Sequence, residues 1–380
     1  MKNLEIIGIT GTNGKTTTAF LIYHLLKKMG KKASLVGTIK YIIGSKSYKA
    51  KLTTPGFIEL SKILKKIKKV GSDFVVIEVS SHGIVQGRIK GLKFSRCLFT
   101  NLSRDHLDYH KTMKNYFFAK KKFFVSQKNA FSFINIDDGY GKNIARGLKK
   151  ASSFAIKSGA DFRAENIVLE KKGSHFQIVS SRKRYKVKTH LCGRYNVLNI
   201  LGAVGLVSSL GFPISKVVAA VSSFKPPLGR LEPVAKDIFI DYAHTSDALS
   251  NTLGNLRESG YEKITCLFGC GGDRDKGKRR LMGQISSLKS DFTFITSDNP
   301  RSEEPLEICS QIEKGFKTKN YSVIVDRRKA IEAAIKFFLQ NKSKNSCLLI
   351  AGKGHEDYQI IKDKRIPFSD KKIVKQLLKR

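Results

Sequence analysis

The fold is decided by Leu4-Glu-Ile-Ile-Gly-Ile-Thr-Gly-Thr-Asn-Gly-Lys-Thr-Thr-Thr18. The apolar run at residues 4–9 predicts a buried parallel strand. A helix that opens near Lys15 is predicted by the spacing of the apolar residues that follow, which are Phe20, Leu21, Leu25 and Leu26. A strand, a glycine-spaced turn, Gly-Lys-Thr and a helix form, in this order, the arrangement that binds phosphate groups.

Each polar or glycine position of this loop has a physical role in such a site. Gly11 and Gly14 let backbone N–H groups approach phosphate oxygens without an intervening side chain. Lys15 adds a positive charge, and the hydroxyl of Thr16 or Thr17 is a ligand for Mg²⁺. The spacing departs from G-x-x-x-x-G-K-[ST], because an isoleucine stands five positions before Gly14. The alternative is a tight strand-to-helix turn without a ligand, and we favour a nucleoside triphosphate site.

The composition predicts a globular protein of two or three domains, since the chain has 380 residues and 41% hydrophobic content. The formal net charge of +40 is compatible with nucleic acid, an acidic membrane surface or highly phosphorylated substrates. Lysines are spread along the whole chain, which favours a general bias in residue usage on a solvated surface. We therefore expect no nucleic-acid partner.

The cysteines and the apolar runs indicate a cytoplasmic protein. The six cysteines lack paired metal-ligand spacing, and Cys266 and Cys270 are expected to be core thiols. No signal peptide is visible, and no apolar run approaches the roughly 20 residues of a membrane span. We expect no membrane association.

Three polar segments in the first half follow predicted strands or precede a helix. Glu78-Val-Ser-Ser-His82 ends an apolar strand, where a second carboxylate directed at Mg²⁺ belongs in a phosphate-loop protein. The segment from Asn101 to His110 holds two His, two Asp, an Arg and an Asn, a set that core packing does not explain. Thr53-Thr-Pro-Gly56 suits an anion or substrate loop, and equally a turn with capping threonines. Farther along, residues 162–190 predict a small antiparallel hairpin layer.

The second half predicts another α/β domain after a proline-rich linker at residues 224–230. Strands near residues 238–241, 264–268, 292–295, 323–325 and 347–350 alternate with helices, as in a doubly wound sheet. Polar loops follow four of them: Asp241-Tyr-Ala-His244, Gly269-Cys-Gly-Gly-Asp-Arg-Asp275, Asp298-Asn-Pro-Arg301 and Gly352-Lys-Gly-His-Glu356. Loops at strand carboxyl ends converge on one crevice, so together they predict a ligand site.

These motifs, in this order and over nearly the whole chain, resemble those of the Mur ligase family. The resemblance is closest to the members that add meso-diaminopimelate to a UDP-linked muramoyl dipeptide, on the strength of Asp298-Asn-Pro-Arg301 and Gly272-Asp-Arg-Asp-Lys-Gly-Lys-Arg279. It implies an α/β fold, with a P-loop mononucleotide-binding central domain at residues 1–226 and a Rossmann-like doubly wound C-terminal amino-acid-binding domain at residues 227–380.

The resemblance also implies roles for single residues. ATP would be bound by Gly11, Thr12, Asn13, Gly14, Lys15, Thr16, Thr17, Asn199, Asp241 and His244. Mg²⁺ would be bound by Thr16, Glu78, His106 and Lys120, and the catalytic set would be Lys15, Glu78, His106 and Lys120. Lys120 would be carbamylated, because a carbamate is an oxygen donor to Mg²⁺ whereas an ammonium is not a ligand.

Two further sets would bind the substrates. The muramoyl dipeptide would be contacted by Thr53, Thr54, Ser80, Gln86 and Arg88. Diaminopimelate would be held by Arg274, Asp298, Asn299, Pro300, Arg301, Gly352 and Glu356, with Arg301 on a carboxylate and Glu356 on an ammonium. The implied reaction is ATP-dependent amide formation through an acyl phosphate, in a monomer that closes about the linker.

One departure from the family keeps alternatives open. Its members carry an N-terminal domain for the UDP group, whereas here the phosphate loop starts at residue eleven. UDP recognition is then lost, or supplied by a separate chain, or the acceptor differs. The alternatives are a related ligase acting on an acceptor without UDP, and a basic nucleotide-dependent nucleic-acid-binding protein with a decayed ligase site.

Overall fold

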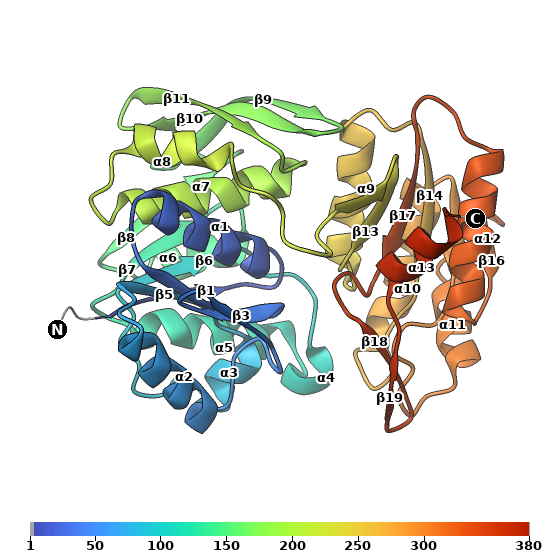
Figure 1. The fold of residues 1–380 in the computed structure, drawn as a ribbon, viewed down its shortest axis with the longest axis horizontal. Coiled ribbons are helices and arrows are strands. Elements are labelled where there is room, and N and C mark those ends of the chain that lie inside the picture. Colours follow the sequence, from blue (N-terminus) through green and yellow to red (C-terminus); the bar gives the residue numbers. More distant parts are fainter. Residues whose placement is uncertain (1–3, 380) are drawn as a thin grey trace. The chain divides into compact units, whose positions relative to one another are not determined.

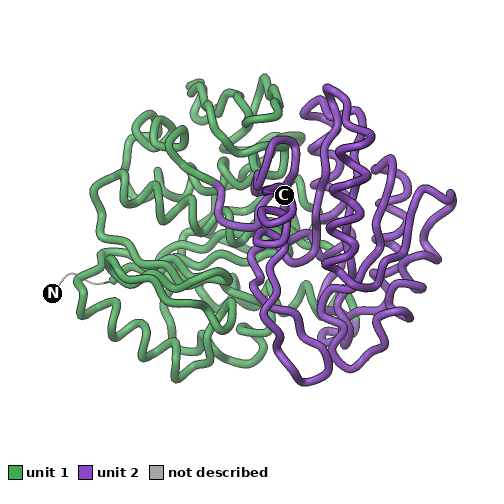
Figure 2. Tube along the Cα trace, turned by 45° about the vertical axis from the view of Figure 1, so that its right-hand side comes forward, with its two compact units in different colours: residues 1–103, 112–225 green, residues 104–111, 226–380 purple. Residues whose placement is uncertain are grey.

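The computed structural model describes residues 4–379. Its contacts divide the chain into two compact units (Figure 2). Unit 1 comprises the residues up to 103 together with 112–225, and unit 2 comprises 104–111 together with the residues from 226 onward. The short segment 104–111 therefore belongs by its contacts to the second unit, although unit 1 precedes and follows it in sequence.

Unit 1 is built on an 11-stranded sheet with the order β11-β10-β9-β8-β7-β6-β1-β5-β2-β3-β4 (Figure 1). Its parallel centre consists of β1 (Glu5–Thr10), β2 (Ala33–Val36), β5 (Phe74–Glu78), β6 (Arg96–Phe99), β7 (Phe131–Asn135) and β8 (Ala151–Ala155). Antiparallel pairs extend it at both ends: β3 (Lys40–Ile43) and β4 (Lys46–Lys49) at one, and β9 (Phe162–Glu170), β10 (Gly173–Ser180) and β11 (Lys183–Thr189) at the other.

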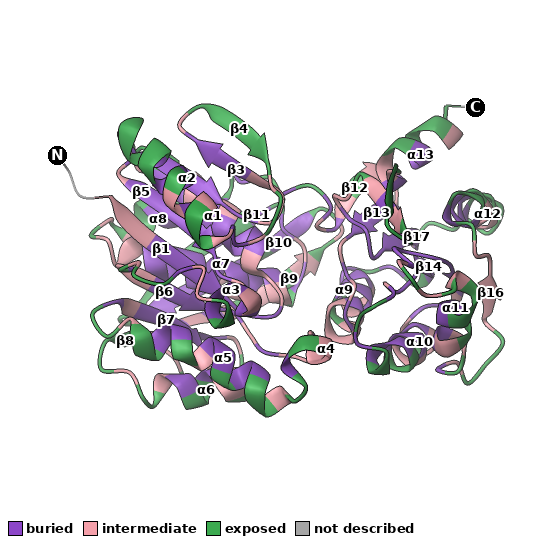
Figure 3. Ribbon diagram, turned by 90° about the horizontal axis from the view of Figure 1, so that it is seen from below, coloured by how far each residue is buried: buried purple, intermediate pink, exposed green. Residues whose placement is uncertain are grey.

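Helices cover both faces of this sheet, as a parallel sheet requires. One face packs against α1 (Lys15–Lys28), α7 (Arg194–Ser208) and α8 (Ile214–Val221). The other packs against α2 (Phe57–Lys69), α3 (Ser81–Val85), α5 (Met113–Ser126) and α6 (Gly139–Ala145). Figure 3 shows the buried residues concentrated on the strands and on the helix sides that face them. The phosphate-loop strand and helix predicted from residues 4–18 are thus confirmed as β1 and α1.

The antiparallel hairpins predicted at residues 162–190 are confirmed as β9, β10 and β11. They continue the main sheet, because β9 also pairs in parallel with β8 through Phe154 and Phe162. Strand β8 was not predicted, because Ser152 and Ser153 interrupt its apolar pattern. The sequence analysis did not predict helix α8, which has Pro213 at its N-cap.

Unit 2 contains a six-stranded sheet with the order β12-β13-β17-β14-β15-β16. The strands are β12 (Glu232–Ala235), β13 (Ile238–Asp241), β14 (Lys263–Phe268), β15 (Phe292–Ile295), β16 (Tyr321–Val323) and β17 (Ser346–Ala351), and only the β12 edge is antiparallel. The predicted strand at 323–325 lies two residues earlier. The helices α12 (Arg327–Gln340) and α13 (Asp370–Leu377) pack on one face. The helices α9 (Ser246–Glu258), α10 (Gly277–Lys289) and α11 (Pro305–Glu313) cover the other (Figure 3).

The remaining elements of unit 2 are short. The segment 104–111 contains α4 (Leu107–His110), and a hairpin of β18 (Tyr358–Ile361) and β19 (Lys364–Pro367) follows β17. Cys266 and Cys270 are buried, as expected for core thiols, and burial raises the pKa of both to about 12. None of the described helices combines the length and the apolar character needed to cross a membrane.

Candidate active site

The loop between β1 and α1 packs closely against neighbouring residues because its glycines carry no side chain. Gly14 has φ +83°, and a Cβ there would lie 2.4 Å from Asn199 Oδ1. A Cβ on Gly11 would lie 1.8 Å from Thr100 Oγ1. Asn101 fixes the loop, since its carbonyl accepts from Thr12 N and its Oδ1 accepts from Asn13 N, both at 2.9 Å. The loop is therefore held from the end of the neighbouring strand β6.

Lys15 and the start of α1 supply positive charge at this loop. Lys15 Nζ donates to the carbonyls of Gly11 and Thr12 at 2.8 Å, so its ammonium lies over the loop. Helix α1 begins at Lys15, where the N–H groups of the first turn and the helix dipole favour an anion. Thr17 is buried in the first turn. Asn199, on α7, accepts from Thr18 Oγ1 at 3.2 Å, so the structure brings it to the same loop.

Glu78 is fully buried at the end of β5 and lies beside the phosphate loop. Its Oε2 accepts from Thr16 Oγ1 and Thr38 Oγ1, and its Oε1 accepts from Thr38 N, all at 2.9 Å. All three donors are neutral, so these bonds leave the carboxylate charge uncompensated. A buried carboxylate in contact with the phosphate-loop hydroxyl is a donor set that fits Mg²⁺, which prefers oxygen ligands.

Lys120 reaches the same loop from α5. Its side chain is 1% exposed, and its Nζ donates to Gly11 O at 2.8 Å and lies 4.8 Å from the centre of the Tyr116 ring. The hydroxyl of Tyr116 in turn lies 3.1 Å from Thr12 Oγ1. A carbamate on Lys120 would put an oxygen donor at this place, which is compatible with the predicted metal site.

The five residues predicted for the muramoyl dipeptide form one network in unit 1. Thr54 Oγ1 donates to Glu78 O at 2.8 Å and accepts from Ser80 N at 2.9 Å. Arg88 donates to Thr54 O at 2.7 Å and to Gln86 Oε1 at 2.9 Å, and Thr53 Oγ1 lies 3.1 Å from Thr38 Oγ1. Thr38 was not predicted. It connects this network to Glu78, and no motif marks it in the sequence.

His106 belongs to unit 2, as does the segment around it. Arg104 forms two hydrogen bonds with Asp275, at 3.0 and 3.1 Å. Asp105 lies 3.4 Å from His106 Nε2 and 3.8 Å from His244 Nε2. Burial alone would raise the pKa of Asp105, but His106, His244 and Lys278 hold it well below its usual range. Thr16, Glu78 and Lys120 lie in unit 1, so a metal site that combines them with His106 remains a prediction.

Asp241 and His244, which complete the set predicted to bind ATP, lie in unit 2, and Asp241 is buried at the end of β13. It accepts a hydrogen bond from Leu231 N at 2.6 Å, and burial raises its pKa. The ring of His244 lies 4.6 Å from that of Tyr242. These two residues stand at the carboxyl end of one strand of unit 2.

The residues predicted for diaminopimelate lie at the carboxyl ends of three neighbouring strands, β14, β15 and β17. Asn299 Nδ2 donates to Glu356 Oε2 at 3.0 Å. Arg301 donates to Gly272 O at 2.6 Å. Burial and the nearby Arg274 lower the pKa of Arg301, while Asp298 and Glu356 oppose this shift.

Two close backbone approaches shape the loops that carry these residues. Gly352 has φ +109°, and a Cβ there would lie 2.7 Å from Asp298 Oδ2. The Pro300 carbonyl would lie 1.9 Å from a Cβ on Gly272, so these two loops touch through their backbones. The sequence prediction omitted Lys353, which is fully buried among these residues. Its position inside Gly352-Lys-Gly-His-Glu356 was visible, but its burial was not.

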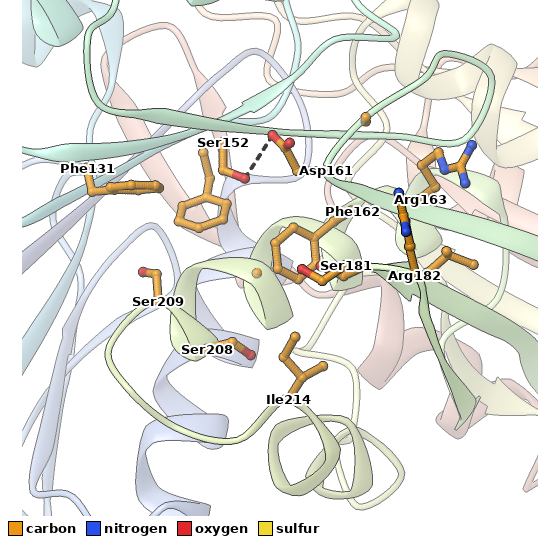
Figure 4. A pocket seen from close by; sticks show the side chains of 15 residues that line it. Phe131, Ser152, Asp161, Phe162, Arg163, Ser181, Arg182, Ser208, Ser209 and Ile214 are labelled. Carbon is orange, nitrogen blue, oxygen red and sulfur yellow. Dashed lines mark hydrogen bonds between the residues drawn. The ribbon is translucent and has the colours of Figure 1, made fainter.

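A cavity of about 620 Å³ also lies in unit 1, away from these residues (Figure 4). It is lined by Phe131 and Phe162 among others, and Phe131 begins β7, at the sheet edge opposite the phosphate loop. Asp161 faces it, but its Oδ2 already accepts from Ser152 and Ser153. None of the predicted site residues lines this cavity, and we assign it no part in the reaction.

Family models match most of the chain. The model described as Mur ligase middle domain matches residues 9–207, and the one described as Mur ligase, glutamate ligase domain matches residues 229–354. The chain belongs to the Mur ligase family. As a Mur ligase it is an ATP-dependent acid–amino-acid ligase, and the α/β fold with a phosphate-loop domain and a doubly wound domain is confirmed.

Named relatives and solved structures show which Mur ligases this chain is similar to. The Clostridium botulinum (strain ATCC 19397 / Type A) protein named UDP-N-acetylmuramoyl-L-alanyl-D-glutamate--2,6-diaminopimelate ligase is 40% identical over 385 residues, which cover 100% of this chain and 78% of that protein. The protein of the same name from Caldanaerobacter subterraneus subsp. tengcongensis (strain DSM 15242 / JCM 11007 / NBRC 100824 / MB4) is 42% identical over 99% of this chain and 78% of its own.

A solved structure with that name is 32% identical, with a TM-score of 0.69 over 100% of this chain and 79% of its own. MurF from Acinetobacter baumannii has a TM-score of 0.78 at 16% identity, over 99% of this chain and 77% of its own, and shares the fold.

Proposed function

We propose that this Mur ligase adds meso-diaminopimelate to the D-glutamate γ-carboxylate of UDP-N-acetylmuramoyl-L-alanyl-D-glutamate. The proposal rests on one observation: the chain has two candidate sites, one in each unit, and is about 40% identical to proteins named UDP-N-acetylmuramoyl-L-alanyl-D-glutamate--2,6-diaminopimelate ligase. Unit 1 holds a phosphate loop beside buried Glu78 and Lys120, and unit 2 holds Arg301 beside a network that contains Glu356.

The first half-reaction transfers a phosphoryl group. The γ-carboxylate attacks the γ-phosphorus of ATP, the bond to the bridging oxygen breaks, and ADP leaves, so that an acyl phosphate forms. Lys15 and the loop N–H groups bind the phosphate oxygens and offset the charge that builds up on them. In unit 1, Mg²⁺ would be held by Thr16, Glu78 and Lys120 as a carbamate, and it would supply further neutralisation of phosphate charge.

The second half-reaction forms the amide. The free amine of diaminopimelate attacks the acyl carbon, a tetrahedral intermediate forms, and inorganic phosphate leaves as the amine loses a proton. Diaminopimelate carries an ammonium and a carboxylate at its distal end. Arg301 suits that carboxylate through its planar fork, and Glu356 suits that ammonium. Asn299 Nδ2 donates to Glu356 at 3.0 Å, and Arg301 Nη1 donates to the Asn299 carbonyl at 3.4 Å, which supports a shared role of Arg301 and Glu356 in holding the distal end while the proximal amine reacts.

Phosphate release in a defined mixture tests the proposal. The protein is incubated with Mg²⁺-ATP, UDP-N-acetylmuramoyl-L-alanyl-D-glutamate and meso-diaminopimelate, and the tripeptide product is identified by its mass. We expect release that depends on all three substrates, with the Lys15→Met variant as the inactive control. Phosphate release with an acceptor that lacks UDP, but not with this acceptor, would contradict the proposed acceptor. An enzyme that works with other amino acids and not with diaminopimelate would contradict the proposed amino acid.

A further inference from the structure

Lys353 is a fully buried cation in the middle of the proposed diaminopimelate pocket. Its Nζ donates to Asn299 Oδ1 at 3.0 Å and to Glu356 Oε2 at 3.1 Å, and lies 4.0 Å from Asp298 Oδ1. Burying an ammonium is costly unless it is paired and hydrogen-bonded, and all three neighbours belong to the set assigned to the substrate. This lysine therefore influences the residues that would contact the amino acid.

Lys353 fixes which oxygen of Glu356 faces a ligand. Oε2 of Glu356 accepts from Lys353 and from Asn299 Nδ2. Oε1 accepts a long hydrogen bond, 3.4 Å, from the hydroxyl of Tyr358. Oε1 consequently keeps most of its capacity to accept, and is the oxygen that an incoming ammonium would use.

Lys353 also changes the charge of the site. Its ammonium offsets one of the two negative charges that Asp298 and Glu356 carry beside it. Without Lys353 the site would be one charge unit more negative, and it would attract a cationic ligand end more strongly.

We propose that Lys353 is a specificity-determining residue that selects the zwitterionic distal end of diaminopimelate over the cationic side chain of L-lysine. The inference rests on the proposed function, since it concerns the amino acid that the same site accepts. L-Lysine differs from diaminopimelate in lacking the distal carboxylate. It therefore presents one net positive charge to the pocket and leaves Arg301 without an anionic partner.

Neutral substitutions of Lys353 test this assignment. Lys353→Met keeps the length of the side chain and removes the charge. Lys353→Gln also removes the charge but keeps a donor that suits Asn299 Oδ1. Lys336→Met is the matched control, because Lys336 is exposed on α12 of the same unit. kcat and KM are measured for diaminopimelate and for L-lysine, and thermal unfolding is recorded for each variant.

We expect the ratio of kcat/KM for diaminopimelate over L-lysine to fall at least tenfold in both Lys353 variants, mainly through a lower KM for L-lysine. Lys336→Met should keep the wild-type ratio. If Lys353→Gln folds and its ratio of kcat/KM for diaminopimelate over L-lysine stays within twofold of wild type, the inference is overturned. This holds whether or not Lys353→Met folds. If both variants unfold, equilibrium binding of L-lysine and of L-norleucine, which lacks the distal ammonium, to the wild-type enzyme decides: L-lysine that binds as tightly as L-norleucine or more tightly contradicts the electrostatic assignment. Absence of turnover by the wild-type enzyme with diaminopimelate would instead refute the proposed function.

Discussion

Replacing Asp370 by asparagine should destabilise unit 2 by leaving a buried guanidinium without its counter-ion. Arg327 and Asp370 are both fully buried, and two hydrogen bonds join them, from Nε to Oδ1 at 2.9 Å and from Nη2 to Oδ2 at 2.8 Å. Arg327 also donates to the carbonyls of Ser297 and Ala351, at 3.3 and 2.9 Å. These two residues directly precede Asp298 and Gly352, so the pair holds the backbone on which the amino-acid pocket is built.

The magnitude follows from the burial of both partners. Removing one partner of a buried ion pair costs about 3–5 kcal/mol, because the remaining charge loses its compensation. A domain of about 150–250 residues loses about 2–4 °C of melting temperature per kcal/mol, so Asp370→Asn should lower the melting temperature of unit 2 by roughly 10 °C. The double variant Arg327→Met/Asp370→Leu should recover most of this loss, because no charge is then left buried.

The measurement must separate the two units, because a protein with two compact units need not unfold in one step. Circular dichroism gives the melting temperature, and hydrogen exchange resolved by peptides assigns the loss to α12, α13 and the ends of β15 and β17. Asp363→Asn is the control, since Asp363 is exposed in the turn between β18 and β19. A melting temperature for Asp370→Asn within about 2 °C of wild type would refute the reasoning, as would a double variant less stable than the single one.

Other predictions concern the phosphate loop, the metal site and the acid stability. Lys15→Met should lower phosphate release by about 100-fold or more while the melting temperature is kept, because the lost charge acts on the transferred group. Glu78→Gln should raise the Mg²⁺ concentration needed for half-maximal activity, as seen in a titration of rate against metal, and an unchanged requirement would exclude Glu78 as a ligand. A ¹³C-bicarbonate-treated sample should show a carbamate resonance that is missing in Lys120→Gln. Hydrogen bonds from Arg279 lower the pKa of Glu303 from 4.5 to about 2, so Glu303 stabilises the fold above pH 4.5 and loses this effect as the pH falls toward 2. Glu303→Gln should therefore be less stable than wild type at pH 7 and equal to it near pH 2, as measured by urea unfolding.

Much of the fold was predictable because its information is local in the sequence. Continuous apolar runs identified β1 and β5, since strands buried on both faces carry no polar alternation. The glycine turn after β1 was also visible in the sequence, and the structure adds that the close approach of Asn199 and Thr100 tolerates no Cβ there. The strand β8 and the helix α8 were not predicted, because their secondary structure depends on the elements that they pack against. Ser152 and Ser153 belong to a strand only through the pairing of β8 with β7.

The same distinction holds for the site residues. Some are marked by a sequence motif, whereas others gain their role only through the residues that bury them. Glu78 and Glu356 stand out in the sequence because each follows an apolar strand. Thr38 and Lys353 do not stand out, because a threonine in a turn and a lysine in a lysine-rich chain are each ordinary until their surroundings are known. The structure gives both a role through contacts with residues 40 and 54 positions away: Thr38 donates twice to Glu78, and Lys353 donates to Asn299. The motifs thus specify which groups meet the substrates, whereas the buried partners of those groups set the charge and orientation with which they do so.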